Sequence, residues 1–383
     1  MTVQKFGGAV LRTPEGFRSM ISIISRLGNQ PCLVVVSAIG STTRSLAEAA
    51  TMASQGADAH AGALIQEVLD QHLLLAESVV SGEHSRRILR HTLMEHCQQA
   101  QRLVSSIALT RQCTARTLDR VMAIGEDLAR CIACAALQDS GINVNEVDSR
   151  SLIVTDASFG QASPLPEATA HRVGHVLGAQ RTGVTVTQGF VASSEHGETT
   201  TMGRESSNLT ASLLASCLGA EDVTIWTDVD GVRTADPSMV ATTYPLRHLH
   251  YDEARIAAAY GLKLLYPTMI EPARRAGIAL RFAHAADPDS PGTSIDAKSG
   301  QSRPLITCET ADRYSTVTAL FTPLRVALRA AQVVIDELEP SLGHDVIDVQ
   351  THAHDRAMSI VVHPHAAPDV VRILHRELCE NPA

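Results

Sequence analysis

The sequence has few aromatic residues and no excess of positive charge. Trp, Tyr and Phe account for 3% of its 383 residues (one, five and six residues), so the hydrophobic core has to be built from Ala, Val, Leu and Ile. The 32 Lys and Arg residues are outnumbered by 41 Asp and Glu, and the formal net charge is −9. This balance argues against a general binder of nucleic acid or anionic membranes. An anionic ligand would need positive charge concentrated locally.

The sequence also lacks membrane-spanning and secretory features. No run of about 18 apolar residues is present, and Met1 leads almost at once into a strand-like segment rather than a signal peptide. The eight cysteines do not form a paired framework. Cys131 and Cys134 form a CxxC motif within one amphipathic helical pattern, so we interpret them as small buried residues rather than a redox pair. We expect a protein of the reducing cytoplasm.

Length and composition indicate a globular protein of two domains. Hydrophobic residues make up 44% and charged residues 19% of the chain, which excludes wholesale disorder and fibrous architectures. A chain of 383 residues corresponds to two domains, or to one large domain with an appendage. The segment Asp287–Ser294 is rich in turn-forming residues. We therefore expect a catalytic domain over residues 1–297 and a small domain over 298–383.

The residue patterns before this boundary predict an α/β fold. The uninterrupted apolar stretch Pro31–Ala38 is typical of a parallel strand that is buried on both faces. Residues 45–138 have an almost wholly helical pattern without proline. Strands are also expected at residues 2–6, 143–148, 183–190 and 222–227, and helices from Pro14 and at 207–218. Such an alternation of strands and helices is the signature of an open, mainly parallel sheet.

The last 70 residues follow a different order. Strand patterns at residues 314–321, 346–351 and 357–362 are combined with helical patterns at 324–338 and 368–378. The resulting β-α-β-β-α order predicts a small ferredoxin-like α+β domain. Its expected fourth strand is either missing or supplied by Leu305–Cys308.

Three segments contain residues suited to chemistry, and the first is Lys5-Phe-Gly7-Gly8 at the end of the first strand. Two glycines let a backbone approach a ligand closely and can form an anion nest, and Lys5 adds a mobile positive charge. The alternative is an ordinary tight turn. The spacing fits neither the P-loop motif GxxxxGK[ST] nor the dinucleotide motif GxGxxG.

The second segment runs from Gly197 to Asn208 and joins a strand to a small-residue helix. Its hydroxyl- and glycine-rich loop leads to a helix start whose dipole favours an anion. Arg204 at this point can bind a carboxylate through two parallel hydrogen bonds. The alternative is a capped helix with a solvated arginine.

The third segment, Trp226–Pro237, begins at the carboxyl end of a strand, where open α/β sheets bind ligands. Its Asp-Val-Asp-Gly sequence resembles half a calcium loop, but the later ligands are absent, so an EF-hand is rejected. Thr227 and Asp228 are better suited to contact a ribose or a purine edge. The histidine pairs at 352/354 and 363/365 lack a completing cluster, and we interpret them as polar surface residues rather than metal ligands.

Taken together, the motifs of residues 3–295 resemble the aspartokinases of the amino acid kinase family. The most specific are Thr199–Arg204 and Trp226–Val232, and they are supported by Lys5–Gly8, Val36–Ala38 with Thr43, Gly125-Glu126 and Gly261–Pro267. The resemblance implies an α/β/α sandwich on an open, mainly parallel sheet. It also implies ATP-dependent phosphorylation of the side-chain carboxylate of L-aspartate to 4-phospho-L-aspartate. The tail resembles the ACT domains, which bind amino-acid effectors and regulate these enzymes.

The resemblance assigns a role to each matched residue. Phosphoryl transfer asks mainly for positioning and charge neutralisation. Lys5 would neutralise charge on the transferred phosphoryl group, with the amides of Gly7 and Gly8 around it. Lys263 would hold the ATP phosphates from the opposite side, and Mg²⁺ would be bound largely by ATP oxygens, with no protein metal ligand. The remaining nucleotide contacts would come from Thr227, Asp228 and Arg233.

The substrate aspartate has to be oriented so that only its β-carboxylate faces ATP. By resemblance, Arg204 would bind the α-carboxylate and Glu126 the α-ammonium group. Ser37 and Thr43 would help to place the substrate. The alternative for Glu126 is an exposed helix residue without a ligand.

The chain departs from the family pattern at several of these positions. The usual Gly-Arg-Gly-Gly-Ser-Asp is here Gly203–Asn208, so a catalytic carboxylate has become the amide of Asn208 and an acid, Glu205, has replaced a glycine. Ala9-Val10 also replaces the usual Thr-Ser. The tail has room for one ACT unit, which makes feedback inhibition by lysine or threonine doubtful.

Three hypotheses follow: an active aspartokinase, a kinase of a related amino acid, and a non-catalytic regulatory homologue. From the resemblance we expect a homodimer that binds no nucleic acid and no membrane.

Overall fold

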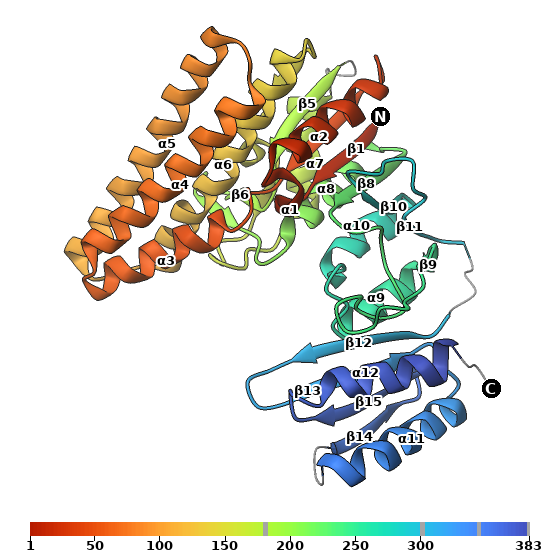
Figure 1. Ribbon diagram of the computed structural model, residues 1–383. Coiled ribbons are helices and arrows are strands. Elements are labelled where there is room, and N and C mark those ends of the chain that lie inside the picture. Colours follow the sequence, from red (N-terminus) through yellow and green to blue (C-terminus); the bar gives the residue numbers. More distant parts are fainter. Residues whose placement is uncertain (179–182, 299–302, 343–345, 381–383) are drawn as a thin grey trace. The chain divides into compact units, whose positions relative to one another are not determined.

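The computed structural model describes residues 1–178, 183–298, 303–342 and 346–380 of the chain, the last four residues of the third range without their side chains. These residues form two compact units (Figure 1). Unit 1 consists of Met1–Val229 and Ala283–Ser290, and unit 2 of Asp230–Phe282 and Pro291–Ala383. The functional division into 1–297 and 298–383 stays a prediction.

Unit 1 contains a parallel sheet. In the order β3-β5-β2-β1-β8, its strands are Val144–Glu146, Val184–Gln188, Cys32–Val36, Thr2–Phe6 and Asp222–Thr227. All five residues of β2 are buried, which agrees with the apolar run that predicted it. Phe6 pairs with both Val36 and Trp226, and Val36 pairs with Gln188. The carboxyl ends of β1, β2, β5 and β8 therefore lie at one edge of the sheet.

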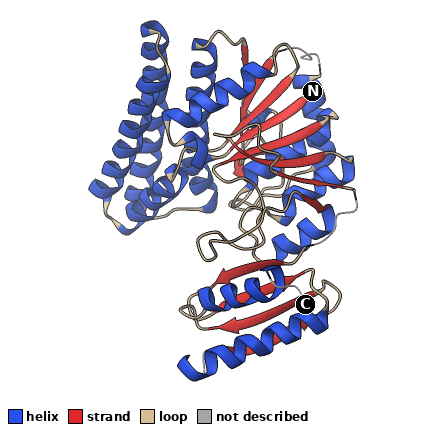
Figure 2. Cartoon of the chain, turned by 45° about the vertical axis from the view of Figure 1, so that its right-hand side comes forward, coloured by secondary structure: helices blue, strands red, loops and turns tan. Residues whose placement is uncertain are grey.

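Helices cover both faces of this sheet (Figure 2), which confirms the α/β/α sandwich. α7 and α8 lie on one face, where α8 contacts β1, β2 and β8. On the other face, α6 contacts β2, β3 and β5, and α3, α4, α5 and α6 pack against one another, with α3 in contact with α4, α5 and α6. The helix bounds are α1 Gly8–Leu11, α2 Pro14–Arg26, α3 Thr42–Gln55, α4 Asp58–Val79, α5 Glu83–Thr110, α6 Ala115–Asp139, α7 Pro166–Leu177 and α8 Ser206–Leu218.

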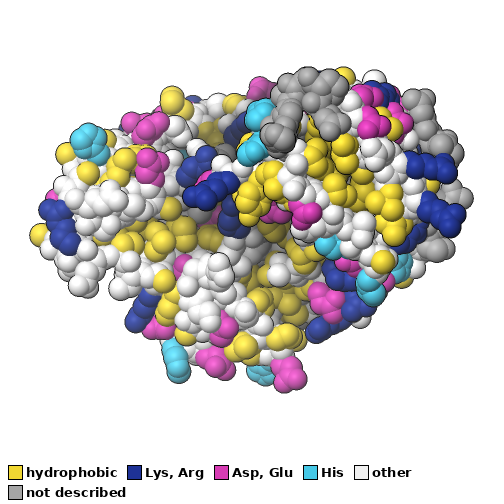
Figure 3. Space-filling view, turned by 90° about the horizontal axis from the view of Figure 1, so that it is seen from below, with side chains coloured by type: hydrophobic (Ala, Val, Ile, Leu, Met, Phe, Trp, Pro, Cys, Tyr) yellow, Lys and Arg dark blue, Asp and Glu magenta, His cyan; other side chains and the backbone are white. Residues whose placement is uncertain are grey.

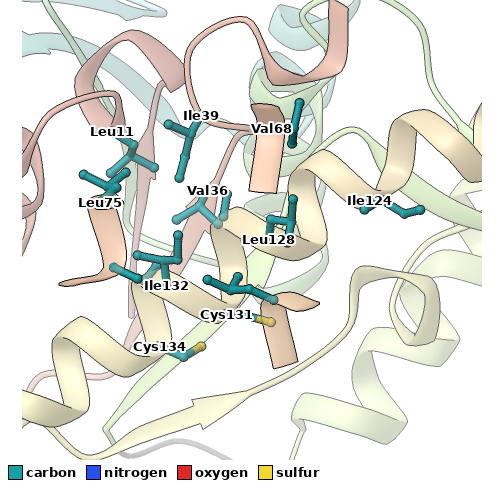
Figure 4. Packing of buried hydrophobic residues seen from close by; sticks show 14 of the residues in the cluster. Leu11, Val36, Ile39, Val68, Leu75, Ile124, Leu128, Cys131, Ile132 and Cys134 are labelled. Atoms are coloured by element: carbon teal, nitrogen blue, oxygen red, sulfur yellow. The ribbon is translucent and has the colours of Figure 1, made fainter. Parts of the chain in front are cut away.

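The core of unit 1 lies between the sheet and this helical layer. Residues from β2 and α4 pack against Ile124, Leu128 and Ile132 of α6 (Figure 4). Cys131 and Cys134 belong to the same cluster, both are free and buried, and burial raises the pKa of Cys131 to about 12. Thiols with so high a pKa are poor nucleophiles, which supports the structural interpretation of the CxxC motif.

A smaller sheet in unit 1 leads towards the start of α8. Its order is β4-β6-β7, with the bounds Val154–Thr155, Val191–Ser194 and Thr199–Thr201. A 3₁₀ turn, Ser149–Ser151, precedes β4. The antiparallel pair of β6 and β7 turns the chain back, so that it enters α8 through Gly203 and Arg204.

Unit 2 begins with a mixed group of strands and helices. β10 pairs antiparallel with β11, and β11 pairs parallel with β9. The bounds are β9 His248–His250, α9 Tyr251–Ala259, α10 Pro267–Ala276, β10 Ala279–His284 and β11 Thr293–Asp296. The side chain of His250 caps α9 and Glu253 reaches back to the His250 amide, which is a capping box.

The tail forms the expected ferredoxin-like fold. Its sheet has the antiparallel order β12-β13-β15-β14, so the fourth strand is present and comes from the segment that includes Leu305–Cys308. Val317, Val334, Ile360 and Val370 share one buried cluster. The bounds are β12 Leu305–Thr310, β13 Ser315–Leu320, α11 Leu324–Leu342, β14 Val346–His352, β15 Ala357–Val362 and α12 Ala367–His375, followed by a π-helical turn, Arg376–Glu380.

The described part of the chain has no helix that is both long and apolar enough to cross a membrane. On the face seen in Figure 3, acidic and basic side chains are interspersed, in line with the charge balance of the sequence.

Candidate functional site

The sheet of unit 1 places most of the predicted site residues at its carboxyl edge. Lys5 lies in β1, with Gly7 and Gly8 directly after it, Ser37 follows β2, and Thr227 ends β8. This edge is where open α/β sheets bind their ligands. Glu126 of α6 is connected to the edge through Thr43, and Arg204 and Asn208 lie at the start of α8, which packs on β1 and β2.

The loop after β1 is fixed by backbone hydrogen bonds and close packing, whereas an anion nest would have free amides. The Gly7 amide donates to the Trp226 carbonyl (3.1 Å), and α1 begins at Gly8. A Cβ at Gly8 would lie 2.2 Å from the Ala38 carbonyl oxygen, so only glycine fits there. The Gly40 amide donates to the Gly8 carbonyl (3.0 Å), which joins the loops after β1 and β2. The phosphate-binding role of Gly7 and Gly8 stays a prediction.

Lys5 is a buried cation. The residue is 5% exposed, and burial lowers the pKa of its ammonium group to about 8, while the charge of Glu205 acts in the opposite direction. Only three of the 32 Lys and Arg residues are lysines, namely Lys5, Lys263 and Lys298, and two of these three are predicted site residues. A desolvated ammonium group interacts strongly with an anion placed beside it.

Glu126 is a buried carboxylate with one unpartnered oxygen. Burial raises its pKa to about 8, and the neighbouring charge of Asp127 acts in the same direction. Its Oε1 accepts from the Thr43 hydroxyl (3.4 Å), and its Oε2 has no hydrogen-bond partner among the described residues. A Cβ at Gly125 would lie 3.1 Å from Thr42 Cγ2 and 3.3 Å from Ala38 Cβ, so α6 packs closely on this loop. An ammonium group is the ligand that suits such a carboxylate.

An ion pair that the sequence analysis missed lies beside Glu126. Arg150 donates to Asp127 through two bonds, Nη1 to Oδ1 and Nη2 to Oδ2, both 2.9 Å. The side-chain amide of Gln188, at the end of β5, donates to Asp127 (3.0 Å) and Asp148 (2.8 Å). This network fixes α6 against the end of β5 and partly offsets the Asp127 charge next to Glu126. The partners are far apart in sequence, and no local pattern indicates the pair.

A second missed residue, Asp119, holds the strand that leads to Arg204. Its carboxylate is fully buried and accepts from the Thr201 amide (3.0 Å), the Thr201 hydroxyl (2.6 Å) and the Gly160 amide (3.0 Å). Because Thr201 ends β7, these bonds set the course of the loop that presents Arg204. In the part of the chain that the structure describes, the Arg204 guanidinium has no ion-pair partner and is exposed.

The departures from the family pattern lie at the start of α8. Glu205 has a left-handed backbone (φ 59°, ψ 13°), a conformation that favours glycine and costs a residue with a Cβ about 1 kcal/mol. Asn208 is buried, and its Oδ1 has no partner among the described residues. The acid at 205 is exposed, and the amide at 208 is neutral. Glu205 thus keeps a backbone conformation that suits the glycine of the family pattern.

The predicted nucleotide contacts are divided between the units. In unit 1, the Thr227 hydroxyl accepts from the Val229 amide (3.0 Å), and Asp228 is exposed. In unit 2, Arg233 is held by Asp230 (2.9 Å) and by the Thr243 hydroxyl (2.7 Å). Lys263 of unit 2 pairs with Asp236 (3.3 Å), and its side chain is 73% exposed, so its ammonium group can exchange partners readily. The nucleotide roles of these residues stay predictions.

A family model described as the amino acid kinase family matches residues 1–284. Among curated proteins, the chain is 28% identical over 310 residues to the chloroplastic aspartokinase 3 of Arabidopsis thaliana, which covers 80% of this chain and 54% of that protein. It is 30% identical over 301 residues to the aspartokinase of Chlamydia pneumoniae, with coverages of 77% and 62%. The chain thus spans about half the length of the first of these relatives.

Solved structures support the fold. The crystal structure of E. coli aspartokinase III in complex with aspartate and ADP (R-state) is 23% identical in sequence, with a TM-score of 0.84 over 99% of both chains. The same enzyme in complex with lysine and aspartate (T-state) gives a TM-score of 0.77 at 20% identity, again over 99% of both chains. The fold of the sandwich and the fold of the tail are therefore each similar to those of solved aspartokinases.

Proposed function

The chain belongs to the amino acid kinase family, and on this premise we propose that it phosphorylates the side-chain carboxylate of L-aspartate with ATP, giving 4-phospho-L-aspartate and ADP. The observation that carries the proposal is the buried Glu126 carboxylate, whose Oε2 is unpartnered and whose Oε1 binds Thr43. The aspartokinase relatives support the choice of substrate.

The geometry suits a substrate with three charged groups. The α-ammonium group binds Glu126, with Thr43 holding the Glu126 carboxylate, and the α-carboxylate binds the exposed guanidinium of Arg204. Ser37, which directly follows β2, helps to place the substrate. With both α-groups held, the β-carboxylate remains free to face the carboxyl edge of the sheet. Orientation of this kind accounts for a large part of enzymatic rate enhancement.

The reaction then needs no general base. A β-carboxylate oxygen of aspartate bonds to the γ-phosphorus of ATP as the bond to the β,γ-bridging oxygen breaks, and ADP leaves with that electron pair. Lys5 neutralises charge on the transferred group, Gly7 and Gly8 approach it closely, and Asn208 donates its amide hydrogens in place of a carboxylate. Thr227, Asp228, Arg233 and Lys263 hold the nucleotide.

Mg²⁺ accompanies ATP in this proposal. Mg²⁺ binds few protein groups beside a nucleotide, so the phosphate oxygens would supply most of its ligands. The ion neutralises phosphate charge when it is bound.

Trapping of the acyl phosphate tests the proposal. The full chain is incubated with ATP, Mg²⁺, L-aspartate and hydroxylamine, and the hydroxamate is quantified. We expect hydroxamate with L-aspartate and little with succinate, which lacks the group that binds Glu126. Glu126→Gln and Arg204→Gln should raise KM for aspartate, and Arg102→Gln on α5 is the matched control. No hydroxamate above background would contradict the proposal.

Glu205 and Asn208 favour a second candidate, a kinase for a related amino acid, because they change the charge beside Arg204. Higher activity with another amino acid than with aspartate would support it. If the natural chain is inactive and the double variant Glu205→Gly/Asn208→Asp is active, the chain is instead a regulatory homologue.

We also propose that the protein is a cytoplasmic homodimer and that its tail binds an amino-acid effector. The ferredoxin-like sheet of the tail supports this, because such sheets can pair edge to edge. Sedimentation equilibrium should give twice the mass of 40.9 kDa, and a monomeric mass would count against the dimer.

A further inference from the structure

Unit 1 contains a cavity that is lined by none of the residues assigned to the reaction. Its volume is about 750 Å³, within the range of cavities that hold metabolites and drug-sized ligands. It lies between the loops after β1 and β2 and the second half of α4; Ile39 and Leu75 of its wall are seen in Figure 4. The lining residues that carry the argument are Arg12, Ile39, His72, Leu74 and Leu75.

The charge of the cavity is positive, although the chain as a whole is acidic. Arg12 is the only Lys, Arg, Asp or Glu among the described lining residues. Its guanidinium is exposed and has no ion-pair partner in the described part of the chain. An unpaired guanidinium in a cavity whose described lining residues include no acid is suited to a carboxylate, which it can bind through two hydrogen bonds.

The walls of the cavity are largely apolar. Ala9, Pro14, Ile39 and Leu75 contribute to them, and Leu74 is 68% exposed although it is a large aliphatic side chain. Removing such surface from water is favourable. The occupant therefore has an apolar body next to its anionic group.

His72 supplies an unused hydrogen-bond acceptor. The residue is 2% exposed, and its Nδ1–H donates to the Val68 carbonyl (2.7 Å) on the same helix. Burial lowers the pKa of the imidazole, so the ring is neutral and Nε2 carries a lone pair. Nε2 has no partner among the described residues. Nε2 is itself buried, so an N–H or O–H donor on an occupant reaches it only after a local shift of the wall, and this contact would then offset the cost of an unsatisfied buried acceptor.

We propose that this cavity binds an amphipathic carboxylate that also carries an N–H or O–H donor, the chemistry of an amino acid with an apolar side chain. The carboxylate faces Arg12, the donor faces His72, and the apolar body lies against Leu74, Leu75 and Ile39. This site is separate from the effector site proposed for the tail, and its occupation does not depend on the proposed reaction.

A ligand in the cavity can affect the candidate site, because the loops after β1 and β2 contribute residues to both. Ala9 follows Gly8 directly, and the lining segment Ile39–Thr42 lies between Ser37 and Thr43. The Gly40 amide donates to the Gly8 carbonyl, and a Cβ at Gly8 would lie only 2.2 Å from the Ala38 carbonyl oxygen, so the two loops are closely packed. A ligand that shifts one loop therefore shifts the other, and we expect it to change KM for aspartate more than kcat.

Binding of 8-anilinonaphthalene-1-sulfonate, which has an anionic group, an N–H donor and an apolar body, tests the site without any activity assay. Leu74→Asp places a like charge beside the probe and Arg12→Gln removes the cation; each should weaken binding about tenfold. Leu109→Asp and Arg102→Gln are matched controls. Leu109 is 87% exposed on α5, and neither control residue lines the cavity, so both variants should bind as the natural chain does. Thermal unfolding verifies that all four variants fold.

L-Leucine, L-phenylalanine and L-tryptophan then serve as competitors, and at least one should displace the probe from the natural chain. Equal weakening in the Leu74→Asp and Leu109→Asp variants would show adsorption to the surface and overturn the proposal. Displacement by none of the three would overturn the carboxylate assignment. A change of oligomer mass in Leu74→Asp would show that the face contacts a second copy instead, which also overturns it.

Discussion

Binding of L-aspartate at pH 7 should release almost one proton, because it forces Glu126 to ionise. The carboxyl group has a pKa of about 8 in the free protein, so at pH 7 it is about 90% protonated. The substrate ammonium group stabilises the ionised form. About 0.9 proton should therefore leave per aspartate bound. Lys5, with a pKa of about 8, is itself about 90% protonated at pH 7 and can take up only about 0.1 proton in return.

Calorimetric titration of the nucleotide-free protein with L-aspartate measures this release. The observed enthalpy is compared between phosphate and Tris buffers at pH 7, and its slope against the ionisation enthalpy of the buffer gives the protons released. Succinate lacks the ammonium group and serves as the matched ligand, with no release expected. The association constant for aspartate should rise about ninefold between pH 6 and 7, since the ionised fraction of Glu126 rises from about 1% to about 9%.

Equal enthalpies in the two buffers, or a release that persists in Glu126→Gln, would refute the assignment of Glu126 to the substrate ammonium group. A release of the same size with succinate would refute it as well.

Three further predictions concern unfolding and the lysine charge. Because burial raises the pKa of Glu126 from 4.5 to about 8, the folded state binds more protons than the unfolded state between these pH values. The free energy of unfolding should therefore fall as pH rises through this interval, by at most about 5 kcal/mol. Urea unfolding at pH 5 and pH 8.5 measures this loss, and the Glu126→Gln variant should not show it. Glu205→Gly should stabilise the fold by about 1 kcal/mol, because it relieves the left-handed backbone at this residue. It should also lower the pKa of Lys5 below its present value, because the nearby negative charge is lost. NMR of the three ¹³C-methylated lysines measures this pKa, and an unchanged Lys5 titration would contradict the interaction. Arg150→Met should cost about 2–3 kcal/mol in urea unfolding, because the buried Asp127 then keeps only the Gln188 amide (3.0 Å) and the more distant Arg130 (3.8 Å), whereas Arg102→Gln should leave stability unchanged.

Much of the fold could be predicted because its signals are local. The apolar run Pro31–Ala38 fixed a buried parallel strand, and the strand predicted over residues 357–362 has the bounds Ala357–Val362 in the structure. The short helix α1 was not predicted, because four residues after two glycines carry no periodicity. The fourth strand of the tail was left open in the sequence, since pairing of β12 with β13 depends on register rather than on composition.

The site was predictable where a single residue within a sequence motif carries the chemistry. Glu126 was proposed as a ligand from its motif, and the structure adds its burial and its unpartnered oxygen. The pair of Asp127 and Arg150 joins α6 to a distant turn, and only the fold brings the two together. Gly8 was expected to let the backbone approach a phosphate, which stays a prediction, whereas the structure shows that glycine is required there because a Cβ would meet the Ala38 carbonyl oxygen.

The fourth strand of the tail sheet, β12, determines where a fragment that contains the tail has to begin. A fragment that begins at Asp312 retains the whole β-α-β-β-α unit, yet it loses the strand that covers one side of β13. The exposed edge of β13 would then offer unpaired amides and carbonyls to any neighbouring chain and promote aggregation. A soluble fragment has to begin upstream of Leu305. In a chimeric protein, a junction between β12 and β13 would likewise take the strands of one folding unit from two different parents.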